Sequence, residues 1–259
     1  MQHSTGYIIG FAVAVCLVCA LFVAGSAVSL KPRQEANIRL DRQKKVLAVA
    51  GVLEEGQRPS ASEITEIYEQ FIRAKVIDLE TGQEDETVEA ASFDQQAAKA
   101  DPDRSSTAPA NDAGIQRLPD HAVVFDVVEG DELKAIILPI EGKGLWSTLY
   151  GYLALAPDAN TVVGITFYDH GETPGLGGEV DNPRWQALWP NRKAYDARGN
   201  AALRVKKGRA GPPEEDPHQV DGLSGATITS RGVTALIQFW LGDDGFGPYL
   251  ASHRAQVEG

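Results

Sequence analysis

A run of small and hydroxyl residues, 221–230, is the part of the chain whose composition points most directly to chemistry. The apolar residues after it recur at helical spacing: Val233, Leu236, Ile237 and Trp240. This spacing predicts that a helix begins within 227–230, where free backbone N–H groups and the positive dipole end favour an anion. Gly225 allows close backbone approach, and a phosphate could esterify the Thr227 hydroxyl. A glycine turn with hydroxyl N-caps is the alternative interpretation.

Two glycine-containing loops, each at the end of a predicted strand, precede this segment: Gly142–Thr148 and His170–Glu179. Such loops gather ligands, and a flat aromatic ligand with a sugar-phosphate tail needs apolar contacts, hydrogen bonds and an anion site. Trp146 and Leu176 offer the apolar contacts. Ser147 and Thr173 offer hydrogen bonds, and Lys207 offers a charge-assisted contact to the phosphate.

Most of these residues also have an ordinary structural interpretation. Trp146 could be a core aromatic residue, and Lys207 a solvated one. Glu172 could cap the backbone N–H groups of its loop as readily as it could contact a ligand. His170 is more typical of a hydrogen-bonded surface histidine than of a proton donor, so we assign no chemistry to it.

Composition limits the possible functions. The chain has 259 residues, of which 43% are hydrophobic, enough for a sizeable core in one large or two small domains. A net charge of −12 argues against nucleic acid as a partner, because the chain has no basic patch to release counterions. No Cys/His cluster has the spacing of a metal site. Both cysteines, Cys16 and Cys19, lie in an apolar run, so the rest of the chain cannot contain a disulfide framework.

That apolar run, Tyr7–Leu30, contains no charged residue. As a helix it would be roughly 36 Å long, enough to cross a hydrocarbon core of about 30 Å. A cleaved signal peptide is the alternative, since 24–26 are small residues, but residues 1–6 contain no Lys or Arg and the run is long for a signal. We predict one retained membrane anchor.

The rest of the chain predicts an α+β fold, in which a transmembrane helix precedes a twisted, mostly antiparallel sheet packed with helices. A polar helix over 34–50 continues from the anchor, Ser60 and Glu63 have capping-box spacing, and 83–118 reads as a linker or irregular segment. Four β-branched runs predict two hairpins: 122–128 with 133–140, and 148–156 with 161–168. Later elements are a helix at 185–189, a strand at 202–205 and a helix at 229–241 that covers the sheet. The expected parts are an anchor (1–33), a helical and linker region packed on the body (34–119) and a ligand-binding domain (120–259).

Together, the three motifs resemble the C subunit of the bacterial sodium-translocating NADH:quinone reductases. Residues 221–227 are similar to the sequon at which a flavin transferase attaches FMN through a phosphoester, which a wider group of flavin-bearing subunits shares. The Gly-Leu-Trp-Ser loop at 144–147 and the Asp-His-Gly-Glu-Thr-Pro loop at 169–174 narrow the resemblance from this wider group to the C subunits. Other matching segments are 30–32, 34–37, 137–140 and 182–185, whereas 83–113 matches least.

The resemblance implies an electron-transfer subunit that carries FMN covalently on Thr227, in a complex that couples NADH oxidation and quinone reduction to sodium export. The implied partners are the other subunits, the flavin transferase and the membrane. No catalytic residue, metal or NADH site is expected in this chain, which has no strand-linked G-x-G-x-x-G. The implied FMN-binding residues are Trp146, Ser147, Glu172, Thr173, Leu176, Gly177, Lys207, Ser224, Gly225, Ala226 and Ile228.

The sequence gives two opposing indications of the orientation in the membrane. Six basic residues follow the apolar run: Lys31, Arg33, Arg39, Arg42, Lys44 and Lys45. The positive-inside rule would therefore keep the body in the cytoplasm. The resemblance implies a bacterial inner-membrane protein with a periplasmic body, and because charge bias can be overridden by partner subunits, we follow the resemblance.

Three alternatives remain at this point. The flavin-bearing G subunit of the Rnf ferredoxin-linked electron transport complex would share the sequon, the anchor and the carrier role. A membrane-anchored binding protein with an unmodified Thr227 would be colourless. A flavin reductase that acts alone would need its own proton donor, for which His170 would be the first candidate. If Thr227 were not the acceptor, Thr229 would be the next one to test.

Overall fold

The computed structural model describes residues 4–53, 57 and 59–258, and the chain divides into two units, 1–42 and 43–259. Helix α1 (Thr5–Val49) confirms the predicted continuation of the apolar helix into a polar one, with Pro32 inside it. Its apolar side chains are open to the surroundings, with Leu21 and Phe22 exposed by 74% and 73%. The helix is long and apolar enough to cross a membrane, which would cover this surface.

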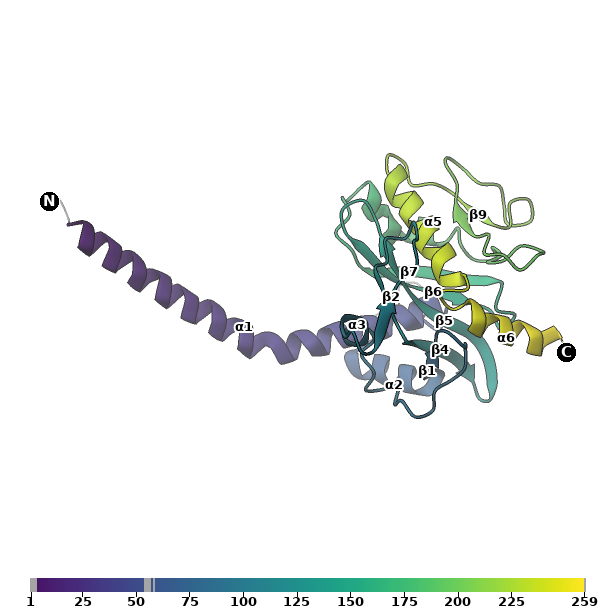
Figure 1. Cartoon of the computed structure of the whole chain (residues 1–259), viewed down its shortest axis with the longest axis horizontal. Helices are drawn as coiled ribbons and strands as arrows, with labels where there is room; N and C mark the ends of the chain where they lie inside the picture. The colour runs from purple at the N-terminus through teal and green to yellow at the C-terminus, as the bar shows by residue number, and fades with distance from the viewer. Residues whose placement is uncertain (1–3, 54–56, 58, 259) are drawn as a thin grey trace. The chain divides into compact units, whose positions relative to one another are not determined.

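The second unit is built on one five-stranded antiparallel sheet, in the order β1-β4-β5-β6-β7 (Figure 1). The strands are β1 (Ile72–Asp78), β4 (His121–Glu129), β5 (Glu132–Lys143), β6 (Thr148–Leu155) and β7 (Val162–Asp169). The α+β fold and both hairpins are therefore confirmed. Strand β1 was not predicted: it continues directly from a helix and pairs with β4, from Ile72 opposite Val127 to Asp78 opposite His121.

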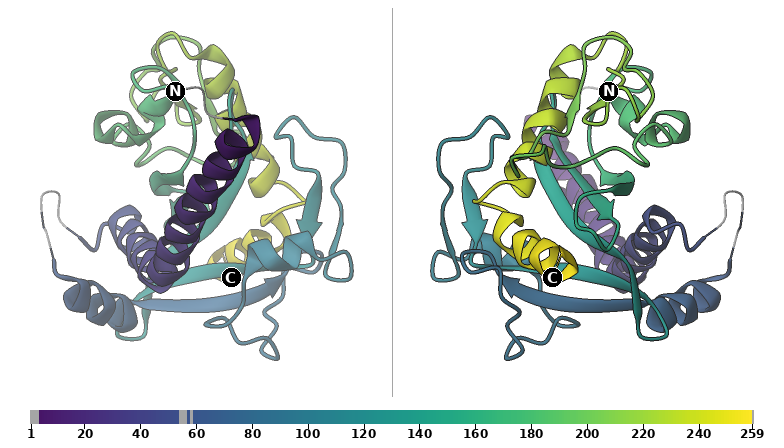
Figure 2. Two further views of the ribbon diagram at one scale, coloured as in Figure 1. Left: turned by 90° about the vertical axis from the view of Figure 1, so that its left-hand side faces the viewer. Right: turned by 90° about the vertical axis from the view of Figure 1, so that its right-hand side faces the viewer.

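Both faces of the sheet are covered. Successive residues of a strand point to opposite faces, and residues of β5 that point to either face are buried. Ile136, Leu138 and Ile140 of β5 share one large cluster with α5 (Thr227–Leu241) and α6 (Gly247–Glu258). Ala135 and Ile137 are equally buried but lie outside that cluster. Figure 2 shows α5 and α6 over one face of the sheet. Near β7, the end of α1 is held by a hydrogen bond from Lys45 Nζ to the Phe167 carbonyl at 3.0 Å.

The smaller elements follow local capping. Helix α2 (Ala61–Phe71) has the predicted capping box, in which Glu63 Oε2 accepts from the Ser60 N–H at 2.7 Å. The segment expected to be irregular contains α3 (Gln95–Ala100), β2 (Ser105–Thr107) and β3 (Arg117–Pro119). These pieces are too short for a periodic signal, and side chains fix them, as when Gln95 Oε1 accepts from the Val123 N–H at 3.0 Å.

Between β7 and α5 lie four short elements: η1 (Gly177–Asp181), α4 (Pro183–Gln186), β8 (Arg204–Val205) and β9 (Gln219–Val220). The helix predicted at 185–189 begins two residues earlier, because Asn182 caps it and Pro183 occupies its first position. The strand predicted at 202–205 is reduced to β8, which pairs with β9 in parallel. Helix α6 was not predicted.

Close packing of α5 on β5 sets the position of the helix. Gly232 lies so near the Lys143 carbonyl that a Cβ atom there would overlap the β5 backbone, and a Cβ on Gly142 would overlap the Leu236 side chain. Near the other end of α5, Trp240 Nε1 donates to the Glu141 carbonyl at 2.7 Å. These contacts therefore fix the distance between the start of α5 and the end of β5.

Gly232→Ala should lower the free energy of unfolding by about 2 kcal/mol, because the new methyl group would push α5 off the strand. The exposed neighbouring substitution Arg231→Ala is the control and should change it by less than about 0.5 kcal/mol. Denaturant unfolding followed by tryptophan fluorescence measures both values. Equal stability of the two variants would contradict this packing account.

Candidate functional site

Helix α5 begins at Thr227, which confirms the predicted start within 227–230 and lies two residues before the bound of 229 given for the whole helix. Its N-cap residue is Ala226, and in the described part of the chain no side chain caps the helix. The Ser230 hydroxyl lies inside the helix and accepts from the Leu223 N–H at 3.1 Å. The N–H groups of the first turn therefore remain available to an external acceptor, as an anion site requires.

The three hydroxyl groups in the first turn of α5 have different environments. Thr229 is fully buried, and its Oγ1 donates to Glu172 Oε2 at 2.6 Å. Ser230 is 7% exposed and engaged with Leu223. Thr227 is exposed and its hydroxyl makes no hydrogen bond within the described part of the chain. Of the three, Thr227 is the hydroxyl free to react.

The Glu172 carboxylate joins the three sequence motifs. One oxygen, Oε1, accepts from the backbone N–H groups of Trp146 at 2.8 Å and Ser147 at 3.3 Å. The other, Oε2, accepts from Thr229. The side chain is buried, and its bonds tie the 144–147 loop and the 170–179 loop to the start of α5. The sequence offered capping of the N–H groups of its own loop or a ligand contact, but Glu172 instead caps N–H groups of the other loop, 144–147.

The environment of Glu172 favours its charged form. Burial by itself would raise the pKa of this carboxyl, but the hydrogen bonds from the Thr229 hydroxyl and from the backbone N–H groups of Trp146, Ser147 and Leu145 outweigh burial and lower the pKa. At neutral pH a carboxylate therefore holds together the 144–147 loop, the 170–179 loop and the start of α5, a contact that we call the three-way junction.

Glycines permit this convergence. A Cβ on Gly144 would lie 2.6 Å from Glu172 Oε1, and one on Gly177 would lie 2.6 Å from both Glu172 Oε2 and Thr229 Oγ1. Gly225 has a φ of +72° and faces Leu176, whose Cδ2 would lie 2.9 Å from an added Cβ. Larger residues at these positions would separate the loops.

An apolar rim surrounds the free hydroxyl. Its members come from all three motifs: Leu145 (40% exposed), Trp146 (69%), Leu176 (44%) and Ile228 (55%). Outside α1, these are the exposed large hydrophobic residues of the described chain. Because such residues otherwise lie in the core, their concentration here indicates a ligand or partner surface. Trp146 is thus not a core residue.

Ser147, a predicted site residue, and His170, which has no assigned role, both support the loops. The Ser147 hydroxyl accepts from the Gly171 N–H at 2.6 Å. Nδ1 of His170 accepts from the Glu172 N–H at 3.2 Å, which leaves Nε2 to donate to Asp181 Oδ2 at 2.9 Å. His170 therefore has a structural environment, in agreement with its lack of an assigned role.

The remaining predicted residues lie at the surface or in the turn. Thr173 and Ser224 are exposed, and Ala226 is the buried N-cap residue. Lys207 is exposed on the segment after β8, which reaches the 221–227 run through a hydrogen bond from the Gly222 N–H to the Gly208 carbonyl at 2.8 Å. This bond places the Lys207 segment beside the run without joining the Lys207 side chain to Thr227.

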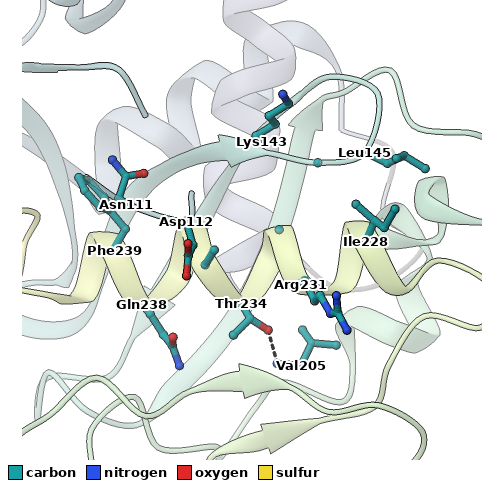
Figure 3. A pocket seen from close by; sticks show the side chains of 13 residues that line it. Asn111, Asp112, Lys143, Leu145, Val205, Ile228, Arg231, Thr234, Gln238 and Phe239 are labelled. Atoms are coloured by element: carbon teal, nitrogen blue, oxygen red, sulfur yellow. Dashed lines mark hydrogen bonds between the residues drawn. The ribbon is translucent and has the colours of Figure 1, made fainter. Parts of the chain in front are cut away.

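A groove of about 850 Å³ runs along α5 from the apolar rim (Figure 3). Leu145 and Ile228 line one end and Phe239 the other (Figure 3). Lys143 and Arg231 also line it, and neither forms an ion pair within the part of the chain that the structure describes. Sequence reasoning missed Arg231, although its position four residues after Thr227 places it on the same helix face.

Comparison with known proteins identifies the family of the chain. The family model of the FMN-binding domain matches residues 144–242, a range that contains the 170–179 and 221–230 segments and all but the first two residues of the 142–148 loop. The chain is 48% identical to the C subunit of the Na(+)-translocating NADH-quinone reductase of Pseudomonas aeruginosa, over 98% of this chain and 97% of the relative. It is 45% identical to that of Yersinia pestis, over 98% and 94%.

Solved structures show the same fold. The crystal structure of Shewanella oneidensis NqrC superimposes with a TM-score of 0.77 at 38% identity, covering 85% of this chain and 99% of that one. The crystal structure of the corresponding reductase subunit from Parabacteroides distasonis superimposes with a TM-score of 0.65 at 27% identity, covering 85% and 96%.

The stabilising effect of Glu172 should depend on pH. A lowered folded-state pKa means that the contribution is fully present above the usual glutamate value of 4.5 and is lost as the pH falls below it. The difference in unfolding free energy between the wild type and Glu172→Gln should stay constant from pH 7 to 5 and shrink below about 4.5. Denaturant titrations across this range test the effect, and a difference that persists at the acid end would contradict it.

Proposed function

This chain belongs to the NqrC family, the C subunits of the Na(+)-translocating NADH-quinone reductases, and we propose that it carries FMN bound covalently to Thr227 as an electron-transfer group. The observation that carries the proposal is the exposed hydroxyl of Thr227 at an uncapped helix start, inside a rim of exposed apolar side chains. When bound, FMN supplies the redox chemistry, and the protein supplies binding, orientation and electrostatics.

The residues present fit such a group. A phosphate on Thr227 would lie at the free N–H groups of α5, where the helix dipole favours negative charge. A flat ring system needs apolar contacts, which Leu145, Trp146, Leu176 and Ile228 offer. Lys207 and Arg231 are exposed cations on the two segments that flank the attachment site, and we assign them to the phosphate end of the ligand.

Esterification of Thr227 is a substitution at phosphorus with no net redox change. The threonine Oγ–P bond forms while the bond from phosphorus to its leaving group breaks, and the hydroxyl proton passes to a base. An unactivated phosphate ester is a poor donor, so the flavin must arrive as an activated phosphate such as a diphosphate. We assign this donor, and the base, to a flavin transferase, because within the described chain no titratable side chain hydrogen-bonds to the Thr227 hydroxyl.

The roles of the other proposed binding residues divide into contact and support. We propose ligand contacts for Trp146, Leu176 and Ile228 on the rim, and for the exposed Thr173. Ser224, Gly225 and Ala226 shape the turn before the helix, with Gly225 in a left-handed conformation. The remaining three support the loops: Glu172 accepts from Trp146 and Ser147, Ser147 accepts from Gly171, and Gly177 leaves room for the Glu172 side chain.

We further propose that α1 anchors the subunit in the bacterial inner membrane, with the body on the periplasmic side. The anchor is supported by the length and hydropathy of the helix. The periplasmic side rests on family membership, against the basic residues that follow the apolar run.

Thr227→Val should abolish covalent flavin and block electron flow through the assembled complex, while the fold stays nearly intact because the side chain is exposed. Thr227→Ser keeps a hydroxyl and is the matched control, which should retain covalent flavin. In-gel flavin fluorescence and intact mass after co-expression with a flavin transferase report loading. Covalent flavin on the valine variant would refute the assignment of Thr227.

Membrane orientation can be measured by thiol labelling, because both native cysteines lie in α1 and are replaceable by alanine. The substitution Arg198→Cys, at an exposed position, should react with a membrane-impermeant maleimide in intact spheroplasts if the body is periplasmic. The same variant in lysed cells is the control for reactivity. Labelling only after lysis would place the body in the cytoplasm.

A further inference from the structure

We infer that Glu172 and Thr229 are positioning residues that fix the acceptor helix against the 144–147 loop, so that Thr227 is presented in the geometry required for flavin attachment. This inference rests on the proposed function. It assigns to these two side chains a role in loading the flavin that does not require either of them to touch it.

The geometry leaves Glu172 little capacity for direct ligand contact. Oε1 already accepts two backbone N–H groups, Oε2 accepts the Thr229 hydroxyl, and the residue is 5% exposed. Gly144 and Gly177 close in on the same two oxygens. The carboxylate is thus enclosed by the protein itself, and its effect on a ligand must pass through the segments it holds.

Those segments carry the surface of the site. The N–H group that Oε1 accepts most closely belongs to Trp146, whose side chain is the most exposed member of the apolar rim. The hydroxyl that Oε2 accepts belongs to Thr229, two residues after the acceptor in the same helical turn. One buried carboxylate therefore fixes the distance between the rim and the acceptor hydroxyl.

The same bond distinguishes between neighbouring hydroxyl groups. Residues 227 and 229 are both threonines in the first turn of α5, so composition alone does not tell them apart. The bond to Glu172 holds the Thr229 hydroxyl inside the protein, at zero exposure. The helix is thereby rotated so that Thr227 faces outward.

The test is the rate of covalent FMN incorporation into the full-length, detergent-solubilised chain by a purified flavin transferase. Thr229→Val keeps the shape of the side chain but removes the donor to Glu172, and Glu172→Ala removes the junction. Both should lower the maximal rate by about tenfold or more, since small misplacements of a reacting group are costly. KM for the protein substrate should change little, because neither side chain is at the surface. Thr229→Ser should restore loading.

Two control variants separate positioning from a general loss of charge or of a helix hydroxyl. Glu179→Gln removes a carboxylate of the same loop, one that accepts from Asn182. Ser252→Ala removes a helix hydroxyl away from the three motifs, one that donates to the Tyr249 carbonyl. Both controls should load at the wild-type rate.

The outcomes are distinct. A wild-type chain that takes up no flavin would overturn the proposed function itself. A wild-type chain that loads, together with folded Thr229→Val and Glu172→Ala variants that load equally fast and give the same visible circular dichroism of the bound flavin, would overturn the positioning role. Thr229→Val decides the question if Glu172→Ala does not fold, because it retains the buried volume.

Discussion

The buried carboxylate of Glu172 is the constraint on which the site depends. Removing a charged group from water is costly, and hydrogen bonds to a charged acceptor offset the cost by about 1.5–3 kcal/mol each. Here the donors are the backbone of Trp146 and Ser147 and the hydroxyl of Thr229. Because each donor belongs to a different loop or helix from Glu172, satisfying this one group brings the three motifs together.

The sheet and the glycines make that convergence possible. Strands β5, β6 and β7 place the two loops at neighbouring strand ends, since β5 and β6 pair from Lys143–Thr148 inward and β6 pairs with β7 up to Asp169. The start of α5 can lie next to these loops because Gly142 and Gly232 allow the helix to contact the β5 backbone. Apolar side chains that a folded protein would normally bury are left at the surface around Thr227, where a flat ligand would cover them.

Much of this arrangement could be predicted from the sequence. The long apolar run, the β-branched hairpins and the helix after 221–226 are local patterns, and the structure has all three. The role of Glu172 could not be predicted, because its partners lie 26 and 57 residues away along the chain. Strand β1 and the pieces within 83–118 were also missed, since β1 follows α2 without a turn signal and the others are fixed by single side-chain contacts.

Peptide mass spectrometry of the wild-type chain, co-expressed with a flavin transferase, tests the central claim most directly. The account predicts an FMN-sized mass addition on the peptide that contains Thr227, with fragment ions that place it on that residue and leave Thr229 unmodified. Folded protein without any addition, or with the addition on another residue, would contradict it.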